Sequence, residues 1–220
     1  MLILVAKIHN TRVYGIGLGV AKINNPIKRF LTRRIINNCD YLGIRDTPSL
    51  HELKKLSTQA NFHLTSDLIF GSGDKIFGKA KVSNSLTNTI GVSIVGLFLK
   101  NNIRKEIVLK SLIGAIEFWV KKGTRVKLLS FQNPNNSELN SDRFYLKEIL
   151  DSFKESDMVS MVDIDASILS INSSYNDIDI IVGMRFHGAV LASMSNTPFV
   201  GFSCDNKISS LCNEFSMPYI

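Results

Sequence analysis

Continuous apolar runs alternate along the chain with longer segments whose apolar residues recur every three or four positions. The run Ile180-Ile181-Val182 contains no polar residue, which is typical of a parallel strand buried on both faces of its sheet. Residues 107–120 carry Val108, Leu112 and Ile116 at i, i+4 spacing, which predicts one face of an α-helix. Because such strands and helices alternate, the pattern predicts βαβ units, a parallel sheet and an α/β fold.

The same reading predicts the order of the elements. Predicted strands lie at residues 11–16, 40–44, 62–70, 89–99, 125–131, 158–163, 180–182 and 198–204. Predicted helices lie at residues 27–38, 107–120, 143–153, 166–172 and 207–215, with two more beginning after Thr47 and after Gly183. Residues 71–88 are rich in Gly, Ser, Asn and Lys and show little periodicity, so they are predicted to connect two domains, at 1–80 and 81–220.

Composition narrows the class of protein. The chain has 220 residues, of which 45% are hydrophobic and 20% charged, as in globular domains. Its net charge of +7 favours anionic partners, but the basic residues are dispersed, so a phosphorylated small molecule fits as well as nucleic acid does. Three cysteines without a C-x-x-C pair indicate a reduced, cytoplasmic compartment. The apolar run at 1–6 is too short for a signal peptide, and no transmembrane segment is expected.

Candidate chemistry is concentrated where the predicted strand at 180–182 passes through Gly183 into a helix. Arg185 and His187 stand at this turn, and ligands of open α/β sheets bind beyond the carboxyl ends of the strands, beside helix N-termini. A purely structural interpretation makes Arg185 a solvated residue and His187 a hydrogen-bonded, partly buried imidazole. Both interpretations stay open for an isolated Arg-x-His.

Arg45 occupies a similar strand-to-helix turn in the first half, before Thr47, a predicted N-cap, and Pro48, the predicted first helical residue. The structural alternative is that Arg45 pairs with Asp46 or Asp40 at the surface. The glycines in Gly15-Ile16-Gly17-Leu18-Gly19 lack the full G-x-G-x-x-G spacing, so a strand-end turn is favoured over a dinucleotide site.

Several separated blocks, in order, resemble the polysaccharide pyruvyl transferase family, from about Thr11 to Phe215. The matching blocks are Tyr14-Gly15-Ile16-Gly17-Leu18-Gly19, Gly43-Ile44-Arg45-Asp46-Thr47-Pro48-Ser49, Ser66-Asp67-Leu68-Ile69-Phe70, Ile90-Gly91-Val92-Ser93, Val182-Gly183-Met184-Arg185-Phe186-His187 and residues 198–207. The resemblance implies two Rossmann-like domains, as in GT-B glycosyltransferases, with Arg45 and Arg185 facing one cleft.

Three departures from the family pattern stand out. The Asn-x-Gly-Asp loop with which members usually begin is missing, so we expect the first domain to be incomplete. Cys204-Asp205-Asn206-Lys207 stands where members tend to have Tyr-Asp-x-Lys, and Leu68 stands where proline is common.

The resemblance also implies the chemistry: transfer of a pyruvyl group from phosphoenolpyruvate onto a sugar hydroxyl of a cell-surface polysaccharide or its precursor, as a ketal. Two arginine forks, Arg185 and Arg45, suit the carboxylate and phosphate of this donor, and His187 is the expected general acid. Phe186, Asp205 and Lys207 are expected to bind substrate, although Asp205 and Lys207 could instead cap the last helix.

The chemistry needs no metal and no cofactor, and the four histidines are scattered. Expected partners are the donor and a sugar or polysaccharide acceptor, without nucleic acid; peripheral association with membrane-bound glycan assembly is compatible with this role.

Two other functions stay open at this point. One is a GT-B-type nucleotide-sugar glycosyltransferase, although no E-x7-E pair marks a ribose site. The other is a truncated, non-catalytic binding or assembly protein, which the missing first loop favours.

Overall fold

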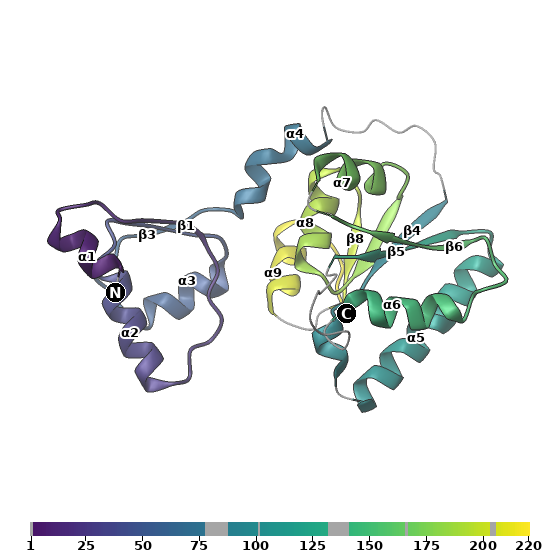
Figure 1. Ribbon diagram of the computed structural model, residues 1–220, viewed down its shortest axis with the longest axis horizontal. Helices are drawn as coiled ribbons and strands as arrows, with labels where there is room; N and C mark the ends of the chain where they lie inside the picture. The colour runs from purple at the N-terminus through teal and green to yellow at the C-terminus, as the bar shows by residue number, and fades with distance from the viewer. Residues whose placement is uncertain (1, 78–87, 101, 132–140, 166, 203–205) are drawn as a thin grey trace. The chain divides into compact units, whose positions relative to one another are not determined.

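The computed structural model describes residues 2–77, 88–100, 102–131, 141–165, 167–202 and 206–220. The chain divides into two compact units, Met1–Ser72 and Gly73–Ile220 (Figure 1). The predicted boundary between residues 80 and 81 lies outside the described residues. The short helix α4 (Gly73–Phe77) belongs to the second unit, where it contacts α7 (Ile168–Tyr175) through the rings of Phe77 and Tyr175, whose centroids are 5.9 Å apart.

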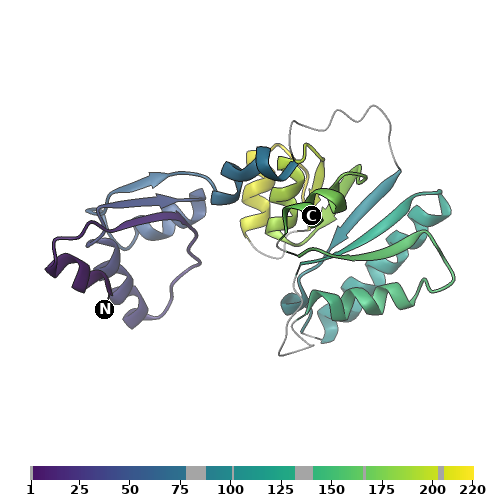
Figure 2. The same ribbon diagram turned by 45° about the horizontal axis from the view of Figure 1, so that its top comes forward.

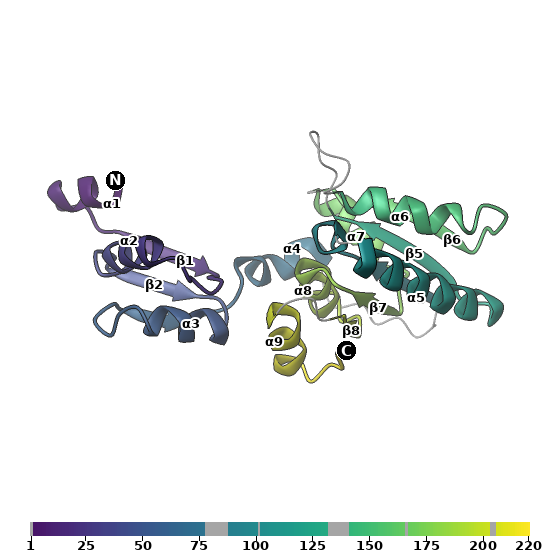
Figure 3. The ribbon, with the colours of Figure 1, turned by 90° about the horizontal axis from the view of Figure 1, so that it is seen from below.

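The first unit is built on a parallel sheet with the order β1-β2-β3. Its elements are α1 (Leu2–Ile8), β1 (Tyr14–Leu18), α2 (Pro26–Ile36), β2 (Tyr41–Ile44), α3 (Thr47–Lys54), β3 (Phe62–Leu64) and the 3₁₀ helix η1 (Leu68–Ser72). Helices α2 and α3 lie on the same face of this sheet (Figures 1 and 3). Ile36, Leu42, Ile44 and Leu53 form the core between them and β2.

Local chemistry explains where the helices of this unit begin. Asn25 caps α2 by accepting a hydrogen bond from the Lys28 amide at 3.0 Å, and Pro26 follows as the first helical residue. The cap of α3 is Asp46, whose carboxylate accepts from the Ser49 amide at 2.7 Å. The predictions of Thr47 as the cap and Pro48 as the first helical residue were therefore wrong by one position, because Asp46 is the cap and Thr47 begins the helix.

Other boundaries in this unit also differ from the sequence prediction. The strand predicted at 62–70 ends at Leu64, because residues 68–72 turn into η1, where the Asp67 carboxylate accepts from the Ile69 amide at 3.2 Å. The apolar run at the N-terminus forms α1, for which no helix was predicted.

The second unit has a five-stranded parallel sheet with the order β6-β5-β4-β7-β8. Its strands are β4 (Thr89–Ser93), β5 (Arg125–Ser130), β6 (Val159–Asp163), β7 (Ile180–Gly183) and β8 (Phe199–Gly201). Its helices are η2 (Gly96–Lys100), α5 (Asn102–Lys121), α6 (Asp142–Asp151), α7, α8 (Phe186–Met194) and α9 (Asn206–Glu214). Helices α5 and α6 cover one face of the sheet, and α7, α8 and α9 the other (Figures 1 and 2).

Two predicted strands in this unit are shorter than expected. The strand predicted at 89–99 stops at Ser93 because the apolar residues that follow form η2, and Leu99 packs in the core from there. The strand predicted at 198–204 is β8, at Phe199–Gly201. A run of apolar residues shows burial but does not distinguish a strand from a buried turn of helix.

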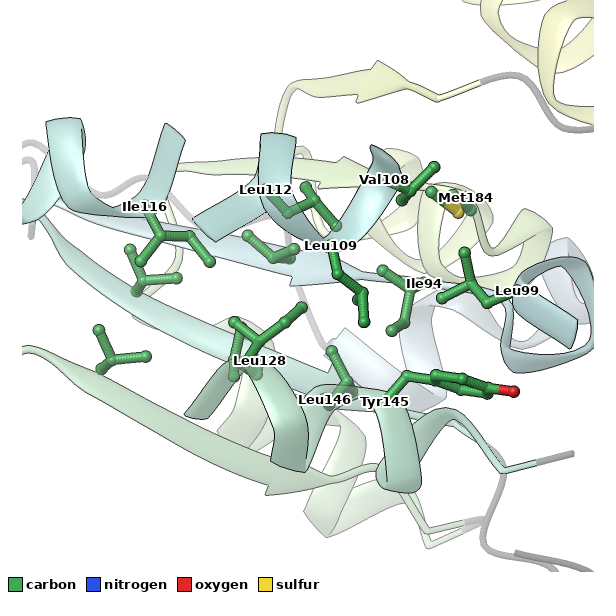
Figure 4. Close-up of a cluster of buried hydrophobic side chains, with 14 residues drawn as sticks. Ile94, Leu99, Val108, Leu109, Leu112, Ile116, Leu128, Tyr145, Leu146 and Met184 are labelled. Carbon is green, nitrogen blue, oxygen red and sulfur yellow. The ribbon is translucent and has the colours of Figure 1, made fainter. Parts of the chain in front are cut away.

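The main core lies between the sheet and the helices α5 and α6 (Figure 4). Leu109, Leu112 and Ile116 of α5 point toward Leu128 of β5 and Ile94. This arrangement confirms the helix face predicted from the i, i+4 spacing. Among the described helices of the chain, none combines the length and the apolar character that a bilayer crossing requires.

Gly183, the last residue of β7, is expected to tolerate no side chain. A Cβ at this position would overlap the Ser93 hydroxyl and lie 3.3 Å from the Ser93 carbonyl oxygen. Gly183→Ala should therefore lower the free energy of unfolding by about 1–3 kcal/mol through overpacking. Equilibrium urea unfolding followed by the fluorescence of Trp119, the single tryptophan, reports on this unit.

Gly114→Ala in α5 is the matched control. A Cβ there meets nothing within 4 Å, so the substitution should raise the free energy of unfolding by about 0.5–1 kcal/mol. Equal destabilisation by both variants would contradict the close approach of β7 to Ser93.

Candidate active site

The strand order of the second unit defines a place for a ligand. The chain proceeds outward from β4 through β5 to β6, then returns to the other side of β4 with β7 and β8. The order reverses between β4 and β7, whose last residues, Ser93 and Gly183, are paired in register. In open α/β sheets, ligands bind beyond the carboxyl ends of the strands at such a switch point. The Arg185-Phe186-His187 segment follows β7 at this switch point.

The first turn of α8 presents the candidate side chains. Arg185 is the N-cap residue with extended backbone angles (φ −82°, ψ 120°), and Phe186 and His187 are the first two helical residues. The first helical hydrogen bond runs from the Ala189 amide to the Arg185 carbonyl at 3.1 Å, so the amides before it have no partner within the helix. His187 is exposed, and its ring meets the edge of the Phe186 ring with centroids 5.5 Å apart. The partly buried imidazole of the structural interpretation is therefore not observed.

Arg185 is held by a carboxylate that the sequence analysis missed. Its Nε donates to Asp142 Oδ2 at 2.8 Å and its Nη2 donates to Asp142 Oδ1 at 2.5 Å. Asp142 is fully buried, while 23% of the Arg185 side chain is exposed. The Gly96 amide donates to the same Asp142 Oδ1 at 2.9 Å. Arg185 is thus a fixed, partly exposed guanidinium and not the solvated side chain of the structural interpretation.

The hydroxyl of Ser93 lies close to the first turn of α8. A Cβ at Gly188 would lie 3.3 Å from the Ser93 hydroxyl and 3.3 Å from the Phe131 ring, so Gly188 brings the helix close to β4 and β5. Ser93 is 1% exposed, and its hydroxyl has no hydrogen-bond partner among the described residues. The buried Ser130 hydroxyl, at the end of β5, also has no hydrogen-bond partner among the described residues.

Tyr175 of α7 forms a hydrogen bond with the backbone of α8. Its hydroxyl donates to the Gly188 carbonyl at 3.1 Å, and burial raises the pKa of Tyr175 well above the usual range of a phenol. Tyr175 therefore stays protonated and acts as a structural hydrogen-bond donor, not as an acid or base.

Arg45 lies at the carboxyl end of β2 in the first unit. Its Nη1 donates to Asp67 at 2.8 Å and its Nε donates to Asp46 at 3.4 Å. The ion pair with Asp46 was one of the structural alternatives; Asp40 pairs instead with Lys7 at 2.7 Å. Two carboxylates around one guanidinium offset its charge, which makes this arginine a weaker attractor of anions than Arg185. Arg45 and Arg185 lie in different units.

The glycines before Arg45 make room for side chains. A Cβ at Gly19 would come within 2.8 Å of Arg45 Cζ and Nη2, and one at Gly17, which has a φ of +66°, would overlap Leu68. The Arg45 amide also donates to the Leu18 carbonyl at 3.0 Å. The glycine motif therefore accommodates the Arg45 turn, in agreement with the strand-end interpretation.

Of the last predicted pair, Asp205 lies outside the described residues. Lys207 is the second residue of α9, partly buried, on a helix that contacts α8. Among the described residues, no three His, Cys, Asp or Glu side chains are grouped as a metal ion would require.

The sequence analysis did not assign Asp142 and Asp67, which pair with the two arginines, or Ser93, which lies close to Gly188 of α8. Asp67 belongs to one of the quoted blocks, and Ser93 ends a predicted strand block, so both carried a weak signal. Asp142 lies one position before the helix predicted at 143–153, although it begins α6, and its contact with Arg185 spans 43 positions.

Comparisons with known proteins bear on the family and the fold of the chain. The family model described as polysaccharide pyruvyl transferase matches residues 1–206. No curated protein resembles the chain at a significant level.

Two solved structures, both of UDP-GlcNAc 2-epimerase from Methanocaldococcus jannaschii, are similar in fold. One has a TM-score of 0.64 at 12% identity and the other, in complex with UDP-GlcNAc and UDP, 0.66 at 13%. The matches cover 99% of this chain but only 62% and 60% of those proteins. They confirm the expectation of two Rossmann-like units related to the GT-B fold. The match over residues 1–206 shows that the chain belongs to the polysaccharide pyruvyl transferase family.

Proposed function

We propose that this chain transfers a pyruvyl group from phosphoenolpyruvate to sugar hydroxyls of a polysaccharide or its precursor as a ketal. The observation that carries the proposal is that Arg185 and His187 share the first turn of α8 at the switch point between β4 and β7. A guanidinium, a helix N-terminus and a proton donor together match a small donor with two anionic groups and a carbon to be protonated.

In this mechanism His187 delivers a proton to the methylene carbon of the donor. The electrons of the carbon–carbon double bond form the new C–H bond, and the neighbouring carbon becomes an oxocarbenium-like centre. A first sugar hydroxyl adds there and gives up its proton, which the now neutral imidazole can accept. The bond from that carbon to the phosphate oxygen then breaks, and a second hydroxyl closes the ketal as its proton passes to the departing phosphate, which leaves as inorganic phosphate.

The remaining candidates take supporting roles in the proposal. Arg185 binds an anionic group of the donor, while Arg45, held by Asp46 and Asp67, contributes to substrate binding from the first unit. Phe186 lies against the His187 ring and would limit its orientations. Lys207 and Asp205 are proposed to serve the donor phosphate or the acceptor. A cytoplasmic location is part of the proposal, and the free thiols of Cys39 and Cys212 support it.

A ligand comparison tests the donor directly. Phosphoenolpyruvate at about 100 times its Kd should stabilise the folded chain by about 2.7 kcal/mol, which is about 5–10 °C in Tm. UDP-GlcNAc at the same concentration should leave Tm unchanged, although it occupies a structure of similar fold. Stabilisation by UDP-GlcNAc without any by phosphoenolpyruvate would favour the nucleotide-sugar alternative.

A further inference from the structure

The carboxylate of Asp142 is completely buried, although it stands at the start of a helix on the outside of the sheet. An ionised carboxylate is costly to remove from water unless hydrogen bonds and an opposite charge compensate it. Asp142 has both, because it accepts from Arg185 Nε, Arg185 Nη2 and the Gly96 amide. The three segments that meet here are far apart in sequence, so the contact exists only in the folded unit.

The pairing restricts how Arg185 can point. Both oxygens of Asp142 engage the Nε and Nη2 side of the guanidinium, and this two-point contact fixes the plane of the group. An arginine side chain otherwise loses rotamer entropy when a ligand immobilises it. Because Asp142 has already ordered the side chain, most of that loss does not accompany ligand binding.

The pairing with Asp142 also changes the kind of interaction by which Arg185 can attract a ligand. Asp142 and Arg185 together carry no net charge, so the pair acts through directed hydrogen bonds more than through long-range attraction. Arg143, the next residue along α6, pairs with Asp163 at the end of β6, where both side chains are more than two-fifths exposed. The two Arg–Asp pairs of this region therefore differ in burial and in the number of contacts between their side chains.

We propose that Asp142 is a positioning residue for the donor site: it holds the Arg185 guanidinium in the orientation that turnover requires and does not touch the donor itself. The identity of the donor as phosphoenolpyruvate rests on the proposed function. The pairing and its effect on a bound oxyanion do not depend on that identity.

Asp142→Asn separates orientation from charge. The amide keeps one acceptor oxygen but turns an N–H₂ group toward the guanidinium, and the site gains one unit of positive charge. We expect kcat with phosphoenolpyruvate to fall about tenfold, while the affinity for inorganic phosphate, measured by calorimetry, stays equal or rises. A residue that only stabilised the fold would lower both together with Tm. Asp163→Asn, the same change in the exposed pair, should alter neither.

Two further variants keep the test decisive. If Asp142→Asn does not fold, Asp142→Glu retains the charge, displaced by one methylene, and should show the same split between kcat and phosphate affinity. In an Arg185→Lys background, Asp142→Asn should reduce kcat by less than threefold, because the planar fork that it positions is already gone. Multiplicative effects of the two substitutions, or a parallel loss of turnover and phosphate affinity, would overturn the proposal.

A readout without substrate separates this inference from the proposed function. In ¹⁵N NMR, the Nε–H of Arg185, assigned by its loss in Arg185→Lys, should exchange slowly with water, and Asp142→Asn should abolish that protection. If wild-type protein shows no reaction with phosphoenolpyruvate, the proposed function has failed, and slow exchange that depends on Asp142 still supports the positioning. Fast exchange in the wild-type protein would contradict it.

Discussion

Replacing His187 by asparagine is expected to slow pyruvyl transfer by about 10²–10⁴-fold while the Kd for phosphoenolpyruvate changes little. The imidazole is exposed at the first turn of α8, where a proton donor can reach a ligand that is bound at the helix N-terminus. Asparagine keeps a hydrogen-bond donor but supplies no proton.

Reaction in D₂O gives this prediction a direct readout. The ketal methyl group should acquire one deuterium per turnover in the wild-type protein, and the rate of its appearance should fall with His187→Asn. His51→Asn is the matched control, because His51 is an exposed histidine on α3 in the first unit. Near wild-type turnover in His187→Asn would mean that another group delivers the proton and that His187 is not catalytic.

Arg185→Lys should weaken phosphoenolpyruvate binding almost as much as removal of the side chain, which at a desolvated anion site costs about 2–5 kcal/mol. Lysine supplies charge without the planar fork, so it cannot contact Asp142 at two points and an oxyanion at the same time. Lysine is also a cleaner test than alanine, because alanine would leave the buried Asp142 without its counter-charge and destabilise the fold by about 3–5 kcal/mol.

Calorimetric titration with phosphoenolpyruvate measures the loss, and Arg143→Lys serves as its control because the Arg143–Asp163 pair is exposed. We expect the control to bind within about twofold of wild type, as is typical for surface pairs worth less than 1 kcal/mol. Unchanged donor affinity in Arg185→Lys would remove Arg185 from the donor site.

The parts of the fold that followed from sequence are those in which periodicity and burial agree. The apolar run Ile180-Ile181-Val182 became β7, and the i, i+4 stripe of α5 became one wall of the main core. Short apolar segments were predicted less well. Leu68 and Ile69 continue an apolar run but form η1, because Asp67 caps the turn with its own carboxylate.

The candidate site was predictable in its backbone but not in its contacts. Gly183 marked the turn after β7, and Arg185 and His187 followed it at a helix N-terminus, as the pattern indicated. The burial of Asp142 and its contact with Arg185 depend on how α6 packs beside η2, which no local pattern encodes. Asp67 reached Arg45 in the same way, across 22 positions.

The product of the reaction tests the central claim most directly. The protein is incubated with ¹³C-labelled phosphoenolpyruvate and the glycan fraction of its source cells, and the glycan is analysed by mass spectrometry and NMR. Pyruvyl transfer predicts a labelled ketal, a mass gain equal to pyruvic acid less water, and one inorganic phosphate released per ketal. Phosphoenolpyruvate that stays intact, or that releases phosphate without adding label to any glycan, would contradict the proposed function.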